Sequence, residues 1–151
     1  MATTQAFPQL MLEVRRIFAA PRERVFAAWT EQEQYAKWMC KVRPDSNVEC
    51  LELDLRPGGT FRVKNHYPNG DTFLLRGQYR EILPPEKLVF TWEWEKAPFC
   101  PAGETLVTVN FLKHGDQTEV VLTHTGFLDV EDHERHNHGW NACLDSLAAI
   151  L

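Results

Sequence analysis

The chain has 151 residues, of which 44% are hydrophobic and 25% are charged, and its net charge is −5. This length and composition predict one globular domain, and the acidic balance without a run of Lys or Arg argues against nucleic acids and anionic membranes as partners. The four cysteines, at positions 40, 50, 100 and 143, form no C-x-x-C pair, so neither a zinc ribbon nor a redox pair is expected.

The first part of the chain predicts one strand and two short helices. Apolar residues alternate loosely over residues 10–18, which indicates a strand. Pro21 stands where a helix could begin. Thr30, followed three residues later by Glu33, forms a capping-box pattern for a second short helix that contains Trp38.

From residue 48 onward the apolar period changes to two, which is the period of a strand. The Asn69-Gly70 pair is the strongest short hairpin signal in the chain. Gly77 stands in mid-strand and fits a bend or a bulge. The pattern predicts six strands over residues 48–54, 60–67, 72–83, 87–95, 104–112 and 118–125.

The last segment predicts a long amphipathic helix with Asp129 as its N-cap. One apolar stripe runs along it, formed by Trp140, Leu144, Leu147 and Leu151. Consecutive strands joined by short turns favour an antiparallel meander, and the helix can bury its stripe against the concave face. The sequence therefore predicts an α+β fold, with a tail over residues 1–9 and a single domain over residues 10–151.

Four segments in this order carry a family resemblance, namely Glu52–Phe61 (ELDLRPGGTF), Ile82–Trp92 (ILPPEKLVFTW), Thr123–Phe127 (THTGF) and Gly139-Trp140. Together with Ala20-Pro21 and Trp38, they make the chain similar to the activator of heat-shock protein 90 ATPase homologue family. That family belongs to the START-like (SRPBCC, helix-grip) superfamily, and the similarity extends from about Val14 to Leu151.

The resemblance implies a helix-grip fold, in which a curved antiparallel sheet of about seven strands wraps around the long C-terminal helix, with two short helices after the first strand. It also implies a hydrophobic cavity between sheet and helix. Many relatives bind apolar small molecules, and some START-like relatives are cyclases, aromatases or self-sacrificing resistance proteins. The namesake co-chaperone joins such a domain to a separate N-terminal domain that does much of the chaperone binding, for which this chain has no room.

A set of mostly aromatic side chains could line such a cavity. Strand parity places seven of them on the concave side, and the helices and one inward-facing histidine complete the set. The alternative is that the rings simply fill the core. The candidate ligand-binding residues are Trp38, Phe61, Phe73, Tyr79, Phe90, Trp92, Trp94, Phe111, His124, His136, Trp140 and Leu144. Trp94 is expected at the mouth, because it stands next to the loop that begins at Pro98.

The histidines leave two interpretations open. His124 is in phase with Val120 and Leu122 and should face inward, where it could serve a ligand, act as a base, or be a hydrogen-bonded core residue. His133, His136 and His138 suggest a metal, but their spacings of three and two do not match the usual helical zinc pair. A solvated helix start is the stronger reading, with His136 as a possible polar group of the cavity.

The leading hypothesis is a non-enzymatic START-like module that binds an apolar or aromatic small molecule, without a cofactor or metal. One alternative is an enzyme of the cyclase, dehydratase or hydrolase kind that uses His124 or His136 as a proton carrier; no cysteine nucleophile is expected. A second alternative is a co-chaperone or regulator acting on the heat-shock protein 90 ATPase. A homodimer is possible. No run reaches the roughly 18 apolar residues of a membrane helix, so a cytoplasmic location is expected.

Overall fold

The computed structural model describes residues 10–41, 43–97 and 103–151. The predicted tail over residues 1–9 lies outside the described residues. One strand, two short helices, six strands and a long helix follow one another, as the sequence predicts. Their bounds are β1 (Leu10–Phe18), α1 (Arg22–Thr30), α2 (Gln32–Trp38), β2 (Asn47–Leu53), β3 (Thr60–His66), β4 (Thr72–Leu83), β5 (Lys87–Lys96), β6 (Thr105–His114), β7 (Gln117–Phe127) and α3 (Val130–Ile150).

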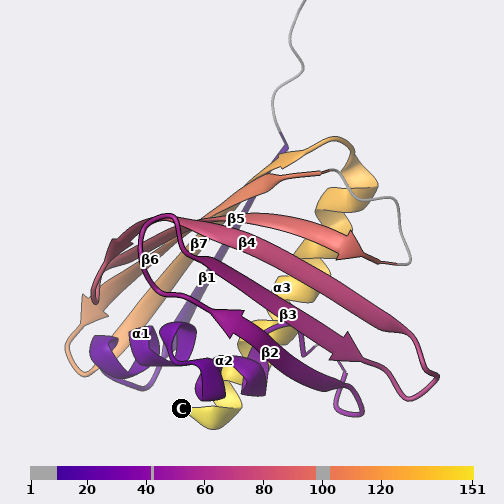
Figure 1. Ribbon diagram of the computed structural model, residues 1–151. Coiled ribbons are helices and arrows are strands. Elements are labelled where there is room, and N and C mark those ends of the chain that lie inside the picture. The colour runs from indigo at the N-terminus through magenta and orange to yellow at the C-terminus, as the bar shows by residue number, and fades with distance from the viewer. Residues whose placement is uncertain (1–9, 42, 98–102) are drawn as a thin grey trace, which may run out of the picture.

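The seven strands form one antiparallel sheet in the order β1-β7-β6-β5-β4-β3-β2. Strands β2 to β7 make a meander, and β1 closes its far edge by pairing with β7, with Val14 opposite Leu122. The sheet curves, and α3 runs across its concave side (Figure 1). This arrangement confirms the predicted α+β helix-grip fold.

Helices α1 and α2 lie at one end of the concave side, together with the C-terminal end of α3 (Figure 1). Trp29 of α1 is the centre of the packing there. Its ring stacks on Trp140 of α3 at a centroid distance of 6.1 Å. Edge-on contacts join it to Trp38 at 4.5 Å and to Phe111 of β6 at 5.9 Å. All four rings are buried, so this end of the space between sheet and helix is filled.

The short helices begin and end differently from the prediction. Helix α1 starts at Arg22, so Pro21 is its extended N-cap residue. The predicted capping box of Thr30 and Glu33 is wrong, because α1 extends through Thr30 and the N-cap of α2 is Glu31, without a side-chain cap. The Thr30 hydroxyl instead donates to the Phe26 carbonyl oxygen at 2.9 Å, which is the usual bond of a threonine in the last turn of a helix.

Helix α3 has the predicted cap and the predicted buried stripe. The Asp129 carboxylate accepts the Asp132 backbone N–H at 2.8 Å. Trp140, Leu144 and Leu147 are buried, and Leu151 packs partly buried against the core. No helix in the described part of the chain is both long and apolar enough to cross a membrane.

Gly77 stands where β4 comes close to both neighbouring strands. It pairs with Phe61 of β3, and the pairing of β4 with β5 shifts register on either side of it. A Cβ atom at Gly77 would collide with the Thr91 carbonyl oxygen and with the Phe61 ring. The glycine is therefore needed for close backbone approach in the curved sheet.

We predict that Gly77→Ala destabilises the protein by about 3 kcal/mol, the upper end of the range for overpacking, because a backbone carbonyl cannot move aside as a side chain can. Urea unfolding followed by far-UV circular dichroism measures the change. Gly139→Ala is the matched control, since a Cβ atom there meets nothing within 4 Å. This control should gain up to about 1 kcal/mol from helix propensity. Equal stability of Gly77→Ala and the parent protein would contradict the explanation.

Candidate ligand-binding cavity

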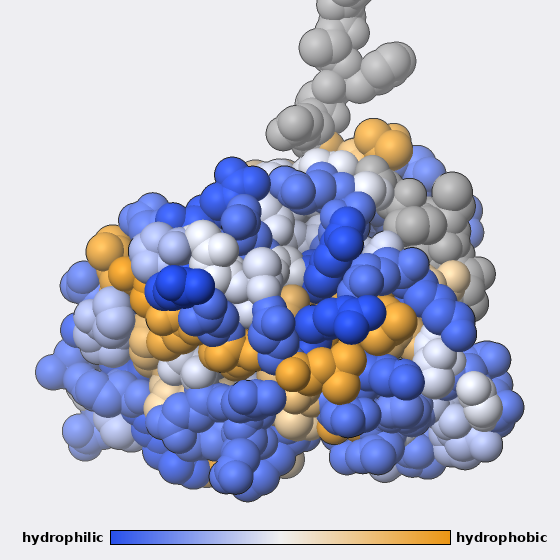
Figure 2. All heavy atoms as spheres, in the orientation of Figure 1, coloured by the Kyte–Doolittle hydropathy of each residue, from blue (hydrophilic) through white to orange (hydrophobic). Residues whose placement is uncertain are grey.

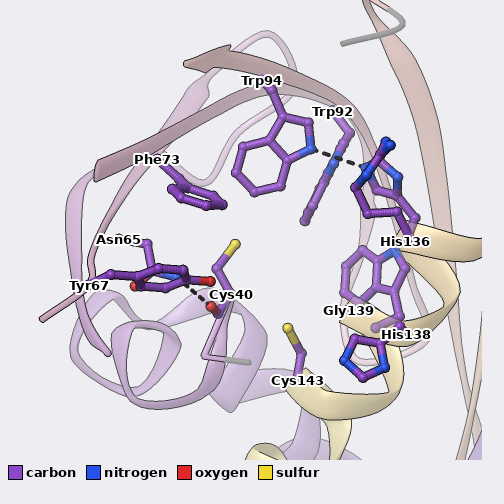
Figure 3. A pocket seen from close by; sticks show the side chains of 12 residues that line it. Cys40, Asn65, Tyr67, Phe73, Trp92, Trp94, His136, His138, Gly139 and Cys143 are labelled. Atoms are coloured by element: carbon purple, nitrogen blue, oxygen red, sulfur yellow. Dashed lines mark hydrogen bonds between the residues drawn. The ribbon is translucent and has the colours of Figure 1, made fainter. Parts of the chain in front are cut away.

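A cavity of about 380 Å³ lies between α3 and the β3–β5 side of the sheet, away from the filled end (Figure 3). Rings from two strands and from α3 provide most of its wall, and α3 contributes half of its residues. The lining residues are Cys40, Asn65, Tyr67, Phe73, Trp92, Trp94, Arg135, His136, His138, Gly139, Trp140 and Cys143.

The cavity has a buried inner end and a partly exposed rim. Cys40, Asn65, Trp92, His136, Trp140 and Cys143 are buried. Tyr67, Phe73, Trp94, Arg135 and Gly139 are partly exposed, and His138 is exposed. An entering molecule would therefore pass an aromatic rim before it reached the side chains that are sealed from solvent.

The rim on the sheet side is a continuous run of rings. Phe73 contacts Tyr67 at a centroid distance of 4.7 Å and Trp94 edge-on at 6.2 Å. Trp94 in turn meets Trp92 edge-on at 5.9 Å. Because these rings support one another, they form a wall with a fixed shape. Trp94 lies at this rim, as its place next to the following loop predicts.

Small side chains leave the space open on the other side. Cys40 and Cys143 face the cavity, and a Cβ atom at Gly139 would meet nothing within 4 Å (Figure 3). Cys40 adopts a φ of 60°, a left-handed conformation that costs about 1–2 kcal/mol for a residue with a side chain.

Burial raises the pKa of the Cys143 thiol to about 12 and holds the pKa of the Cys40 thiol well above its ordinary value. Both thiols are therefore protonated and neutral at physiological pH.

A chain of hydrogen bonds ties α3 to three strands behind the cavity. The Trp140 indole N–H donates to Nδ1 of His124 on β7 at 3.0 Å. Nε2 of His124 lies 2.7 Å from the Thr105 hydroxyl of β6, and that hydroxyl donates to the Trp92 carbonyl oxygen of β5 at 2.8 Å. Because an indole can only donate, Nδ1 must accept, so the proton of His124 sits on Nε2.

His124 is therefore neutral, and both of its ring nitrogens are occupied. Burial lowers its pKa well below the ordinary value of 6.5, and the neighbouring His136 lowers it further. Protonation at Nδ1 would place two N–H groups face to face. The residue faces inward as predicted, but it lies behind Trp140 and does not line the cavity.

His136 does line the cavity, and it is held in the same manner. Its Nε2 accepts the Trp94 indole N–H at 3.0 Å, while Nδ1 lies 2.9 Å from the Asp132 carbonyl oxygen and 3.3 Å from its carboxylate. Burial lowers the pKa of His136, although contacts with Asp132 act in the opposite direction. Arg135 donates to the Asp132 carboxylate at 2.8 Å, so the negative charge of Asp132 is balanced by the guanidinium group.

The structure brings five of the twelve predicted residues to the cavity, namely Phe73, Trp92, Trp94, His136 and Trp140. The others lie outside it and pack in the core: Trp38, Phe61, Tyr79, Phe90, Phe111, His124 and Leu144. Phe61, for example, is surrounded by the rings of Tyr35, Tyr79 and Phe90. These seven side chains fill the core, which is the alternative to lining a cavity that the sequence left open.

Helical spacing from His136 and Trp140 could have added Arg135, Gly139 and Cys143, and strand parity from Phe61 and Val63 could have added Asn65. No pattern in the sequence indicates Cys40. The three helix histidines are neighbours but do not form one cluster: His133 and His136 both contact Phe127, and His136 and His138 both line the cavity. Among the described residues, no group of three His, Cys, Asp or Glu side chains could hold a metal ion.

Two buried polar atoms of the cavity residues have no hydrogen-bond partner among the described residues. One is the Oδ1 acceptor of Asn65, and the other is the Nε1 donor of Trp92. Such atoms are rare in folded proteins, because a buried polar group without a partner is destabilising by about 1–3 kcal/mol. Both atoms therefore mark places where a bound molecule or a water would be stabilised.

Comparison with known proteins agrees with this architecture. The family described as Activator of Hsp90 ATPase homolog 1-like protein matches residues 19–151. A structure from Chromobacterium violaceum is similar with a TM-score of 0.82 and 25% identity, covering 93% of this chain and 95% of that one. One from Rhizobium leguminosarum has a TM-score of 0.78 and 28% identity, covering 93% of both chains. The AHSA1 protein of Silicibacter pomeroyi has a TM-score of 0.78 and 25% identity, covering 93% and 96%. No curated protein shows a significant match.

The neutral, buried state of His124 predicts a loss of stability in acid. Its pKa is 6.5 in the unfolded chain and lower in the folded one, so below pH 6.5 the unfolded chain binds the extra proton. The free energy of unfolding is thus fully retained above pH 6.5 and falls as the pH drops below it.

We predict that His124→Phe lowers the free energy of unfolding by about 2 kcal/mol at neutral pH, because the Trp140 N–H loses its buried acceptor. Between about pH 7.5 and about pH 5.5, this variant should lose about 1 kcal/mol less than the parent protein. Urea unfolding at both pH values measures this. His114→Gln, at an exposed histidine, is the control and should lose as much stability between the two pH values as the parent protein does. An unchanged acid loss in His124→Phe would refute the assignment.

Proposed function

Since the chain belongs to the family of Activator of Hsp90 ATPase homolog 1-like proteins, we propose that it is a non-enzymatic domain that binds a small apolar or aromatic molecule between its sheet and α3. The START-like fold of this family supports ligand binding in general. The observation that carries the finer proposal is the 380 Å³ cavity with its aromatic rim and buried inner end.

The size and chemistry of the cavity fit a small ligand. Sites for small molecules occupy roughly 300–1,000 Å³ and combine apolar walls with a few polar groups. Here the walls are rings and thiols, and the inner polar groups come from Asn65, Trp92 and His136. Rings of the ligand could contact Phe73 and Trp94 edge-on or in an offset stack, which adds about 0.5–1.5 kcal/mol per pair beyond area burial.

The hydrogen bonds of the two histidines favour binding over acid–base catalysis. A general base needs a lone pair that can reach the proton to be removed. In His124 and His136, that lone pair already accepts an indole N–H at 3.0 Å. Either histidine would have to break this bond to act, and burial keeps the pKa of both low.

The family name, together with one surface feature, supports a second candidate function, the regulation of a heat-shock protein 90 ATPase. Where β7 turns into α3, Leu128 is 77% exposed and Val130 is 64% exposed, and Met11 of the neighbouring strand is 55% exposed. Exposed apolar side chains that gather in one place are typical of contact surfaces. An ATPase assay with the chaperone tests this candidate: no change in rate on adding the protein would rule it out.

Gly139 provides a direct test of the binding proposal. Its neighbours one helical turn away, Arg135 and Cys143, both line the cavity, so a side chain at position 139 must enter the same space. We predict that Gly139→Leu weakens binding of prodan, a neutral naphthalene dye, by about tenfold or more, because the leucine occupies part of the cavity. The blue shift of prodan emission on titration measures the affinity.

Gly139→Ala is the matched control, because it has the same gain in helix propensity and only one added carbon atom. It should bind prodan within about twofold of the parent protein, and both variants should be at least as stable as the parent. Equal binding of prodan by Gly139→Leu and by the parent protein would argue against a ligand in this cavity.

A further inference from the structure

Asn65 is an unusual residue for the wall of an apolar cavity. It is only 3% exposed, and it continues the inward-facing row of Phe61 and Val63 on β3. Figure 3 shows it beside Cys40 and Tyr67, across the cavity from His136. A leucine at this place would have the same branched shape and number of side-chain heavy atoms without desolvating an amide, so the presence of an asparagine requires an explanation.

One half of the amide has a partner, and that partner fixes the orientation of the other half. The Asn65 Nδ2 group donates to the Cys40 carbonyl oxygen at 2.8 Å. A carbonyl oxygen can only accept, so the amide cannot be turned around without losing this bond. The acceptor Oδ1 is thereby held in place, and it has no partner among the described residues.

The charges around the cavity exclude a simple ion as the missing partner. The two thiols are protonated, His136 is neutral, and Arg135 is paired with Asp132 at 2.8 Å. A charged ligand would lose its hydration without gaining an opposite charge in the inner end. The group that meets Oδ1 should therefore be a neutral donor, an O–H or an N–H.

We propose that the ligand of this cavity is a neutral aromatic molecule with a hydroxyl or ring N–H, such as a phenol or an indole, whose donor bonds to Asn65 Oδ1. The inference rests on the proposed binding function and specifies the chemical class of the ligand. Asn65 is then the residue that determines specificity, while the rings of the rim supply affinity without selecting a polar group.

Trp92 supports the choice of a hydroxyl over a group that only donates. Its buried Nε1 is a donor without a partner among the described residues, so the two unpaired atoms require opposite roles. A hydroxyl group can donate and accept, and a water bound beside it can pass the second bond to the indole. A ligand with only acceptors would leave Asn65 Oδ1 unpaired.

The test compares three ligands of nearly equal shape by isothermal titration calorimetry. 2-Naphthol has a donor, 2-methoxynaphthalene has only an acceptor, and 2-methylnaphthalene has neither. If the protein formed no hydrogen bond to the ligand, 2-methylnaphthalene should bind best of the three, because it is the least polar and leaves water most readily. We expect 2-naphthol to bind at least roughly tenfold tighter than either analogue, since they leave a buried acceptor unpaired.

Asn65→Leu removes the acceptor, together with the donor to the Cys40 carbonyl oxygen, and keeps the branched shape and the number of side-chain heavy atoms. In this variant, the preference for 2-naphthol should disappear, and 2-methylnaphthalene should bind at least as well as it does to the parent protein. Phe73→Leu is the control: it removes ring contacts, so all three affinities should fall together and their ratios should stay constant. If Asn65→Leu does not fold, the three ligands on the parent protein decide the question by themselves.

The outcomes separate this inference from the function on which it rests. If the parent protein binds all three ligands equally, or if Asn65→Leu keeps the preference, the role of Asn65 is refuted and the cavity remains a binding site. If none of the three binds, the proposed binding function fails, and the inference fails with it.

Discussion

The hydrogen-bond chain from Trp140 through His124 and Thr105 to the Trp92 carbonyl is the constraint on which the rest of the structure depends. It joins α3 to β7, β6 and β5 in one direction, with each group donating to the next. Apolar packing alone would allow a helix to slide or rotate on a curved sheet, since it has little directional preference. A chain of buried donors and acceptors permits one register, because any shift would leave unpaired groups away from water. The position of α3, and with it one wall of the cavity, follows from this chain.

The same logic separates the polar atoms that serve the fold from those that remain available. His124 and His136 are the residues that chemistry would first suggest as functional, yet each is held by an indole N–H on one nitrogen and by an acceptor on the other. Asn65 is the opposite case, because its Nδ2 is bound to Cys40 and its Oδ1 is not paired within the described residues. Under the proposed function, the unpaired Oδ1 of Asn65 is therefore a better guide to the chemistry of a ligand than His124 and His136, whose ring nitrogens all have partners.

The sequence predicts the fold well, because strand period, turn residues and helix stripe are local patterns that agree with one another. The strand over residues 72–83 and the Asp129 cap are found where they are predicted. The predicted capping box at Thr30 is wrong, because the sequence pattern does not show whether Thr30 is the last residue of one helix or the N-cap of the next. The cavity is predicted less well, because inward-facing rings such as Trp92 and Phe61 look alike in sequence. What separates them is which element faces them: α2 brings the ring of Tyr35 onto Phe61, whereas Trp92 faces α3, which also contributes Gly139 to the cavity.

This contrast explains why a space remains at all in a protein so rich in rings. Helices α1 and α2 fill one end of the concave side with Trp29 and Trp38, and no corresponding element among the described residues fills the other end (Figure 1). There α3 and the segment after α2 contribute Gly139, Cys143 and Cys40, the small members of the lining. The face of the molecule that Figure 2 shows is mostly hydrophilic, with hydrophobic residues between the polar ones. The volume of the cavity thus depends on three small residues, while, under the proposed function, the rings of the rim would accept many flat molecules and Asn65 would select among them. If the chain binds a ligand as proposed, a change of ligand during evolution would require substitutions at Gly139, Cys143, Cys40 and Asn65, and the hydrogen-bond chain that positions α3 would stay intact.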